Sequence, residues 1–202
     1  MNVFVVDERL DPTGLGWTRY ARSYPGGGLT IPIARGTRIE GLCRQIVSQV
    51  PGRIDVLFLC CHSDNMGDAI EVMLGEGLTA DTARHFELLR DKWAARAHIE
   101  MHSCLVASET EAQCSPNPAY RESWQQDLAN LGRWLGGEAT VRPTVCRGTS
   151  GPSAPGHPIM QALADAAGVT VWAGVDNQEP DRHFMFEGPI HYYHPATPAS
   201  LP

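Results

Sequence analysis

The chain alternates between apolar blocks typical of strands and spaced apolar positions typical of helices. Short apolar runs at residues 3–6 and 29–33 predict strands, and Pro32 places the second at a sheet edge. Between Arg38 and Val50, apolar residues recur at helical spacing. The nearly continuous run IDVLFLCC, residues 54–61, then predicts a strand that is buried on both faces of a parallel sheet.

The rest of the chain continues this alternation. The pattern predicts a short hairpin arm at 70–74 and then a helix at 79–95. Thr79 is the expected N-cap of this helix, and its apolar face carries Ala83, Phe86, Leu89 and Trp93. The elements predicted after it are a strand at 98–102, helices at 122–135 and 159–167, a strand at 169–175 and an edge strand at 184–193. Strands that alternate with helices predict an α/β fold with a mostly parallel central sheet and right-handed crossovers. We expect one domain over residues 1–195 and a flexible C-terminal tail at 196–202.

Charge and hydropathy exclude some function classes. The formal net charge is −7, and no stretch has the Lys/Arg density that nucleic-acid binding needs. No segment reaches the ~18 apolar residues of a membrane helix, so we expect no membrane partner. The first residues, MNVFVVDERLD, lack a basic region and a cleavage site. We therefore expect a cytoplasmic protein, or one exported without a classical signal peptide.

The six cysteines contain no CxxC spacing, which argues against a zinc ribbon or a thioredoxin-type site. Cys43, Cys60 and Cys61 lie in apolar stretches, as buried free thiols do. Cys60 and Cys61 are adjacent in a predicted strand, so we expect one on each face of the sheet. Reduced thiols in the cytosol are the simpler interpretation.

Two predicted strands end at residues with complementary chemistry. His62 follows the strand at 54–61, and Cys104 follows the strand at 98–102. Catalytic groups in open α/β sheets gather at the carboxyl ends of the strands. If the two strands are neighbours, the imidazole of His62 can deprotonate the thiol of Cys104 and produce a strong nucleophile. Backbone N–H groups near residues 63–67 and at Cys104 could form an oxyanion hole.

Three stretches carry a resemblance to a known superfamily. They are IDVLFLCCHSDNMGDAIEVMLGEGLTADTARHFELL, AHIEMHSCLVAS and IMQALADAAGVTVWAGVDN, in this order between residues 54 and 177. Together they resemble the caspase-like (clan CD) cysteine peptidases, which include caspases, gingipains, separases and CHAT peptidases. The closest similarity is to the caspase-like domain of unknown function found in large bacterial repeat-containing surface proteins. The chain has Ser63 where the family usually has Gly after the His, and Ser103 where a small residue, often Gly, usually precedes the Cys.

The resemblance implies a three-layer sandwich and a cysteine endopeptidase, with Cys104 as nucleophile and His62 as general base and acid. It implies a protein or peptide substrate, no cofactor and no metal, and a role as a bacterial effector or a self-processing protease. The specificity pocket would be built partly by the strand at 169–175 and the loop after it. We assign Ser63, Trp172 and Asp176 to substrate binding, with Trp172 alternatively a core residue.

The loop after that strand suggests a substrate preference. It carries Asp176, Glu179 and Asp181 against one basic residue, Arg182. A carboxylate in the pocket binds a basic side chain, and it binds Arg best through a bidentate contact. We therefore expect Arg at the P1 position of the substrate. In the alternative, these acidic residues are solvated and the pocket is apolar.

Other interpretations remain open at this point. Ser63 and Ser103 are also compatible with a catalytically silent caspase-like binding module, because a fold does not fix a function. His62, His102 and Cys104 could instead bind zinc in a metal-dependent hydrolase. His102 lies two residues before Cys104, on the same side of the predicted strand, and we expect it to pack rather than to orient substrate. Three histidines near the C-terminus are expected at the surface: His183, His191 and His194.

Overall fold

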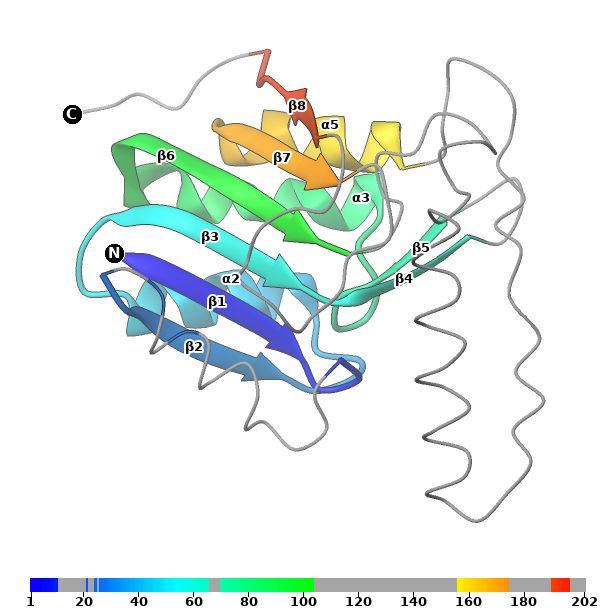
Figure 1. Ribbon diagram of the computed structural model, residues 1–202, viewed down its shortest axis with the longest axis horizontal. Coiled ribbons are helices and arrows are strands. Elements are labelled where there is room, and N and C mark those ends of the chain that lie inside the picture. Colours follow the sequence, from blue (N-terminus) through cyan, green and yellow to red (C-terminus); the bar gives the residue numbers. More distant parts are fainter. Residues whose placement is uncertain are drawn as a thin grey trace, which may run out of the picture.

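A computed structural model describes residues 1–10, 21, 24, 26–65, 70–103, 156–174 and 190–196. These residues form an α/β structure around a six-stranded sheet with the strand order β2-β1-β3-β6-β7-β8 (Figure 1). The strands are β1 (Asn2–Asp7), β2 (Gly28–Ile33), β3 (Ile54–Cys60), β6 (Trp93–His102), β7 (Thr170–Gly174) and β8 (Ile190–Tyr193). Neighbouring strands are parallel except β7 and β8, which are antiparallel. The predicted α/β class and mostly parallel sheet are confirmed.

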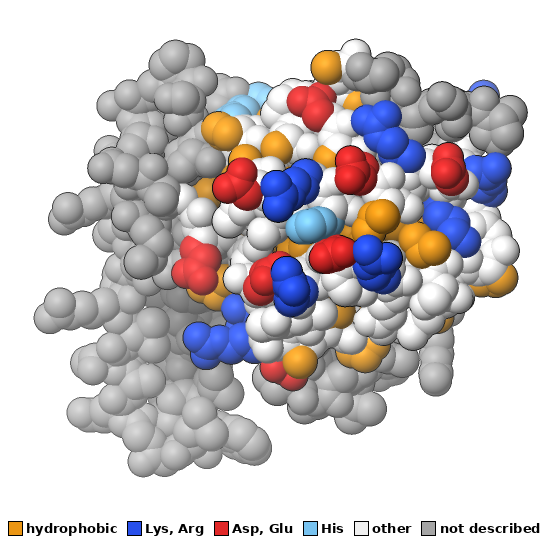
Figure 2. All heavy atoms as spheres, turned by 180° about the vertical axis from the view of Figure 1, so that it is seen from behind, with side chains coloured by type: hydrophobic (Ala, Val, Ile, Leu, Met, Phe, Trp, Pro, Cys, Tyr) orange, Lys and Arg blue, Asp and Glu red, His pale blue; other side chains and the backbone are white. Residues whose placement is uncertain are grey.

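The described helices lie on one face of this sheet (Figure 1). They are α2 (Ile39–Gln49), α3 (Ala80–Ala83), the 3-10 helix η1 (Arg84–Lys92) and α5 (His157–Ala167). Their apolar sides and alternate residues of the strands form the larger hydrophobic core. Seen from the helical side, acidic and basic side chains are interspersed over the surface (Figure 2). No helix among the described residues is both long enough and apolar enough to span a bilayer.

The opposite face of the sheet carries a second, smaller apolar cluster. The rings of Phe4 and Phe58 stack with centroids 4.4 Å apart, and Tyr24 packs edge-on against Phe58 at 5.1 Å. Cys60 belongs to this cluster, whereas Cys61 belongs to the larger core. Both cysteines are buried. The prediction that they lie on opposite faces is confirmed, because side chains alternate along a strand.

Two helix ends that the sequence predicts, the start at Thr79 and the stop at Gly168, are present in the structure. Thr79 caps α3 through its hydroxyl, which accepts from the backbone N–H of Thr82, and the Thr82 hydroxyl accepts in return from the Thr79 N–H. Further along the chain, α5 stops at Gly168, which has a φ of 74°. This left-handed conformation favours glycine, so the predicted stop is confirmed.

The predicted helix at 79–95 is wrong over its last residues. Helical structure ends at Lys92, and Trp93 is the first residue of β6, where it pairs with Ile54 of β3. Trp93 is fully buried, and its indole N–H donates to the carbonyl of Ala167 at 2.8 Å. A buried tryptophan fits a helical stripe and a central strand equally well, and the pairing with β3 decides between them.

The end of η1 contacts the carboxyl ends of two other helices. Lys92 Nζ donates to the carbonyl of Val50, directly after α2, at 2.8 Å. Arg90 donates through Nε and Nη2 to the carbonyls of Ala166 and Asp165, at the end of α5, at 2.9 and 2.6 Å. These side chains satisfy terminal carbonyls that have no partner within their own helices.

Some predicted elements lie wholly or partly outside the described residues. The helix at 122–135 and the tail from 197 onward are among them. Of the predicted edge strand at 184–193, the described part is β8, which lies at the edge of the sheet as expected. The remaining predicted strands at 3–6, 29–33, 54–61, 98–102 and 169–175 correspond to β1, β2, β3, β6 and β7, although β6 begins earlier than predicted, at Trp93.

Candidate active site

The two strands that precede the candidate dyad are neighbours in the sheet. β3 and β6 are parallel, and Cys60 at the end of β3 pairs with His102 at the end of β6. One residue further, the backbone N–H of Cys61 donates to the carbonyl of His102 at 3.2 Å. His62 is the next residue after Cys61 in the sequence, and it is exposed. Cys104, two residues after His102, lies outside the described residues.

The residues from His62 onward form a short strand. Residues His62–Asn65 form β4, which pairs antiparallel with β5 (Ile70–Met73) as a separate two-stranded sheet. In this hairpin His62 pairs with Met73, and Ser63 pairs with Val72. The sequence of β4 is polar and carries no apolar alternation, so its strand character comes from pairing with β5. The predicted hairpin arm at 70–74 is confirmed as β5.

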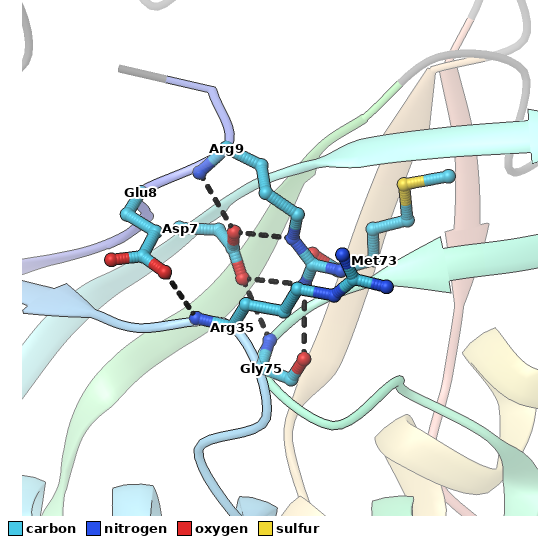
Figure 3. A network of polar contacts seen from close by, with 6 residues as sticks. All are labelled: Asp7, Glu8, Arg9, Arg35, Met73 and Gly75. Atoms are coloured by element: carbon cyan, nitrogen blue, oxygen red, sulfur yellow. Dashed lines mark hydrogen bonds and ion pairs between the residues drawn. The ribbon is translucent and has the colours of Figure 1, made fainter. Parts of the chain in front are cut away.

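A partly buried ion pair joins this hairpin to the end of β1 (Figure 3). The carboxylate of Asp7 is fully buried and accepts from Arg9 Nε at 2.7 Å and from Arg9 Nη2 at 2.8 Å. It also accepts from the backbone N–H groups of Arg9 and Gly75, at 3.0 and 2.8 Å. Arg9 Nη2 donates further to the carbonyls of Met73 and Gly75, at 2.6 and 3.0 Å.

The surroundings keep Asp7 ionised. Burial by itself would raise the pKa of this carboxyl, because the charged form loses its hydration. The hydrogen bonds from the Arg9 side chain and from the backbone of Gly75 and Arg9, together with the Arg9 charge, outweigh burial and leave the pKa below its ordinary value. The same contact raises the pKa of Arg9.

A second buried carboxylate lies on β6 beside the candidate dyad. Glu100 is 7% exposed, and its two oxygens contact two histidines of the same strand: His98 Nε2 at 3.0 Å and His102 Nε2 at 2.9 Å. Residues 98, 100 and 102 share one face because side chains alternate along a strand. His102 is buried. Its expected packing role is confirmed, and the packing includes a carboxylate.

Glu100 also remains ionised despite its burial. Burial would raise the pKa of Glu100, but the hydrogen bonds and charges of His102 and His98 outweigh it and lower the pKa from its ordinary value of 4.5. The negative charge contributes to raising the pKa of Tyr24, where burial is the larger cause. It contributes in the same way to raising the pKa of Cys60.

The Glu100 contacts predict a dependence of stability on acid. A carboxyl whose pKa is lower in the folded chain stabilises the fold above its unfolded pKa, and this contribution is lost as the pH falls through the folded pKa. We expect Glu100→Gln to lower the free energy of unfolding by about 2 kcal/mol at pH 7. The difference from wild type should shrink as the pH approaches 3, because wild type then loses the same charge.

Urea unfolding at pH 7, 5 and 3 measures this effect. The exposed Glu87 provides a matched control, and Glu87→Gln should change the free energy of unfolding by less than about 0.5 kcal/mol at each pH. A difference between Glu100→Gln and wild type that stays constant from pH 7 to pH 3 would contradict the assignment.

The predicted specificity residues are only partly described. Trp172 on β7 is half-buried and stacks on the His98 ring with centroids 4.0 Å apart, while Tyr192 of β8 packs edge-on against it at 5.5 Å. Trp172 also pairs with Glu100 in the strand register. It therefore lies on the sheet face that carries the histidines, away from the larger core. Asp176 lies outside the described residues.

No disulfide joins the described cysteines, and two of them lie in environments that oppose ionisation. Burial, with a smaller contribution from Glu40, raises the pKa of Cys43 to about 12. Burial chiefly raises the pKa of Cys60 as well. Neither thiol is suited to act as a nucleophile, because the reactive species is the thiolate.

One further observation concerns the zinc interpretation. Within the described ranges, no group of three His, Cys, Asp or Glu side chains could hold a metal ion. Cys104, the third member of the suggested zinc set, is not in those ranges.

Ser103 is buried, and its hydroxyl has no hydrogen-bond partner in the part of the chain that the structure describes.

Sequence patterns alone did not single out four residues of this region. His98 and Glu100 stand in the sequence HIEMH, where alternation with His102 already predicts one shared face. Asp7 had a weaker signal, as an acidic residue placed directly after an apolar strand. Arg9 had none, because its partners Met73 and Gly75 are more than 60 positions away.

No family model, no curated protein and no solved structure matches this chain.

Proposed function

We propose that this protein is a cysteine endopeptidase of the caspase-like type, with Cys104 as nucleophile and His62 as general base and acid. We include in this proposal the caspase-like three-layer sandwich as the specific form of the α/β fold. The substrate would be a protein or a peptide, and the reaction would need no cofactor. The protein would act as a bacterial effector or as a self-processing protease.

The observation that carries the proposal is the pairing of β3 with β6. The resemblance requires a His and a Cys directly after two neighbouring strands of a mostly parallel sheet. Here the backbone N–H of Cys61 donates to the carbonyl of His102. His62 is the next residue after Cys61, and Cys104 lies two positions after His102 in the sequence. This is the edge at which α/β proteins place their catalytic groups.

The proposed reaction proceeds through an acyl-enzyme. His62 takes the thiol proton, and the Cys104 sulfur attacks the scissile carbonyl carbon. The imidazolium returns the proton to the departing amine nitrogen as the C–N bond breaks, which leaves a thioester. Water then attacks the thioester carbonyl carbon while His62 accepts a proton from the water; the C–S bond breaks, the imidazolium returns that proton to the Cys104 sulfur, and the carboxylic acid product leaves. Backbone N–H groups near residues 63–67 and at Cys104 would stabilise the oxyanion.

We further propose that the P1 residue is Arg. The support is the acidic composition of the loop after β7, with Asp176, Glu179 and Asp181, and the charge-assisted contact that a carboxylate forms with a guanidinium. Trp172 and Ser63 would contact substrate beside this pocket. We also propose a cytoplasmic location, or export without a classical signal peptide.

Covalent trapping tests this proposal directly. Peptide electrophiles that differ only in Arg, Lys, Asp or Leu at P1 are incubated with the full chain, and the modified residue is identified by mass spectrometry. We expect labelling of Cys104, fastest with Arg at P1, and slow labelling of Cys43 and Cys60 because their thiols are protonated. Labelling of Cys104 no faster than that of a free small thiol would favour the silent binding module. Faster labelling with Asp or Leu would reject the Arg pocket alone.

A further inference from the structure

The ion pair at the end of β1 has no part in the proposed reaction, yet it contacts the hairpin that carries His62 (Figure 3). We propose that Arg9 is a positioning residue that fixes the β4–β5 hairpin, and His62 with it, at the carboxyl ends of β1 and β3. Only the catalytic consequence of this role rests on the proposed function. The structural role stands on contacts among described residues.

The connection from Arg9 to His62 takes two steps. Arg9 Nη2 donates to the carbonyl of Met73 at 2.6 Å, and Met73 is the residue that pairs with His62 across the hairpin. The same nitrogen donates to the carbonyl of Gly75 at 3.0 Å, just beyond the end of β5. The backbone opposite His62 is therefore bound to a side chain from another part of the fold.

Asp7 connects Arg9 to the central sheet. It is the last residue of β1 and pairs with Ile33 of β2, and its carboxylate is fully buried. The carboxylate binds two nitrogens of the Arg9 guanidinium and also accepts from the Gly75 N–H at 2.8 Å. The planar guanidinium can donate to a carboxylate and to carbonyls at once, whereas a lysine ammonium lacks this fork geometry.

The hairpin needs such an anchor. An isolated two-stranded hairpin is at best marginally stable in water. At its start, the backbone of Cys61 is bound to His102 of β6. At the base of its second strand, opposite His62, the backbone of Met73 and Gly75 is bound to Arg9 and Asp7. His62 is thus held between the end of β6 and the end of β1, and a displacement of about 1 Å at a catalytic group can reduce a rate about 10²-fold.

The test compares three variants of the full chain with wild type. Arg9→Lys keeps the charge but not the fork. Asp7→Asn/Arg9→Gln removes both charges, so no unpaired carboxylate is left buried and the chain can fold even if a single substitution at Arg9 cannot. Arg44→Gln is the control, because Arg44 is exposed and forms its ion pair with Glu40 of its own helix.

Amide hydrogen exchange is the first measurement. In Asp7→Asn/Arg9→Gln we expect the protection of amides in β4 and β5 to fall at least about 10-fold, while amides of β3 stay within about threefold of wild type. Arg9→Lys should show most of this loss, and Arg44→Gln none of it. Hairpin amides that exchange no faster than in wild type would overturn the proposal.

Kinetics with a fluorogenic peptide carrying Arg at P1 is the second measurement. We expect kcat to fall at least about 10-fold in the double variant with KM within about threefold, because a displaced His62 affects the chemical step and not substrate binding. Faster exchange with unchanged kcat would overturn the positioning role.

If wild type shows no Cys104-dependent cleavage, the proposed function fails. The NMR signals of the His62 ring then decide the role of Arg9, since unchanged signals in the double variant overturn it and shifted signals support it.

Discussion

Exchange of Cys104 for alanine is expected to reduce peptide cleavage at least about 10⁴-fold, and His62→Ala is expected to reduce it to a similar level. In the proposed mechanism the two residues act as one unit, because the thiol is a weak nucleophile without the imidazole and the imidazole has no nucleophile to activate without the thiol. For the same reason the double variant should be no less active than either single variant. The measurement is kcat/KM for a fluorogenic peptide.

Two substitutions serve as controls for this experiment. Cys114→Ala removes another thiol, and His85→Ala removes a histidine of η1 on the helical side of the sheet. Both should retain wild-type kcat/KM within about threefold. If Cys104→Ala and wild type cleave the peptide at equal rates, the nucleophile is misassigned and the binding-module interpretation becomes the better one.

Replacement of Gly75 by alanine is expected to lower the free energy of unfolding by about 3 kcal/mol. Gly75 has a φ of 57°, a left-handed conformation that side chains disfavour. A Cβ at this position would lie 2.3 Å from the carbonyl oxygen of Thr37, so backbone would have to move. Moving it would also disturb the contacts of Gly75 with Asp7 and Arg9. Strain and lost hydrogen bonds together account for the expected magnitude.

Two other glycines separate the causes of this loss. Gly77 has a φ of 112° but open space where a methyl group would lie, so Gly77→Ala reports backbone strain without a steric contact and should cost about 2 kcal/mol. Gly52 has neither strain nor a close neighbour, and Gly52→Ala should change stability by less than about 0.5 kcal/mol. Urea unfolding measures all three. Equal losses for Gly75→Ala and Gly77→Ala would show that the contact with Thr37 is unimportant.

The sheet was largely predictable because its central strands are rich in apolar residues. The run at 54–61 became β3 with hardly a change of boundary, and Gly168 ended α5 as its sequence position indicates. The errors occur where one residue satisfies two patterns or none. Trp93 continues a helical stripe and also fits a central strand, and the polar residues of β4 have no strand pattern at all. In both places the structure depends on a partner strand elsewhere in the chain.

The candidate site divides in the same way. The placement of His62 and Cys104 directly after strands could be read from the sequence, but the pairing of β3 with β6 was only a condition there and comes from the structure. The shared face of Glu100 and His102 follows from alternation. The connection of Arg9 to Met73 could not be predicted, because it joins two segments that have no common sequence pattern.

The short segment at the end of η1 has a consequence for how the fold is lost. Arg90 and Lys92 bind terminal carbonyls of α5 and α2, so two helices far apart in sequence depend on the same few residues. If this segment detaches, carbonyls at the ends of both helices lose their partners together, and neither helix can fray alone without disturbing it. Residues from the first 50 and the last 50 positions of the chain are thereby coupled, which favours cooperative unfolding over stepwise loss of the helical layer.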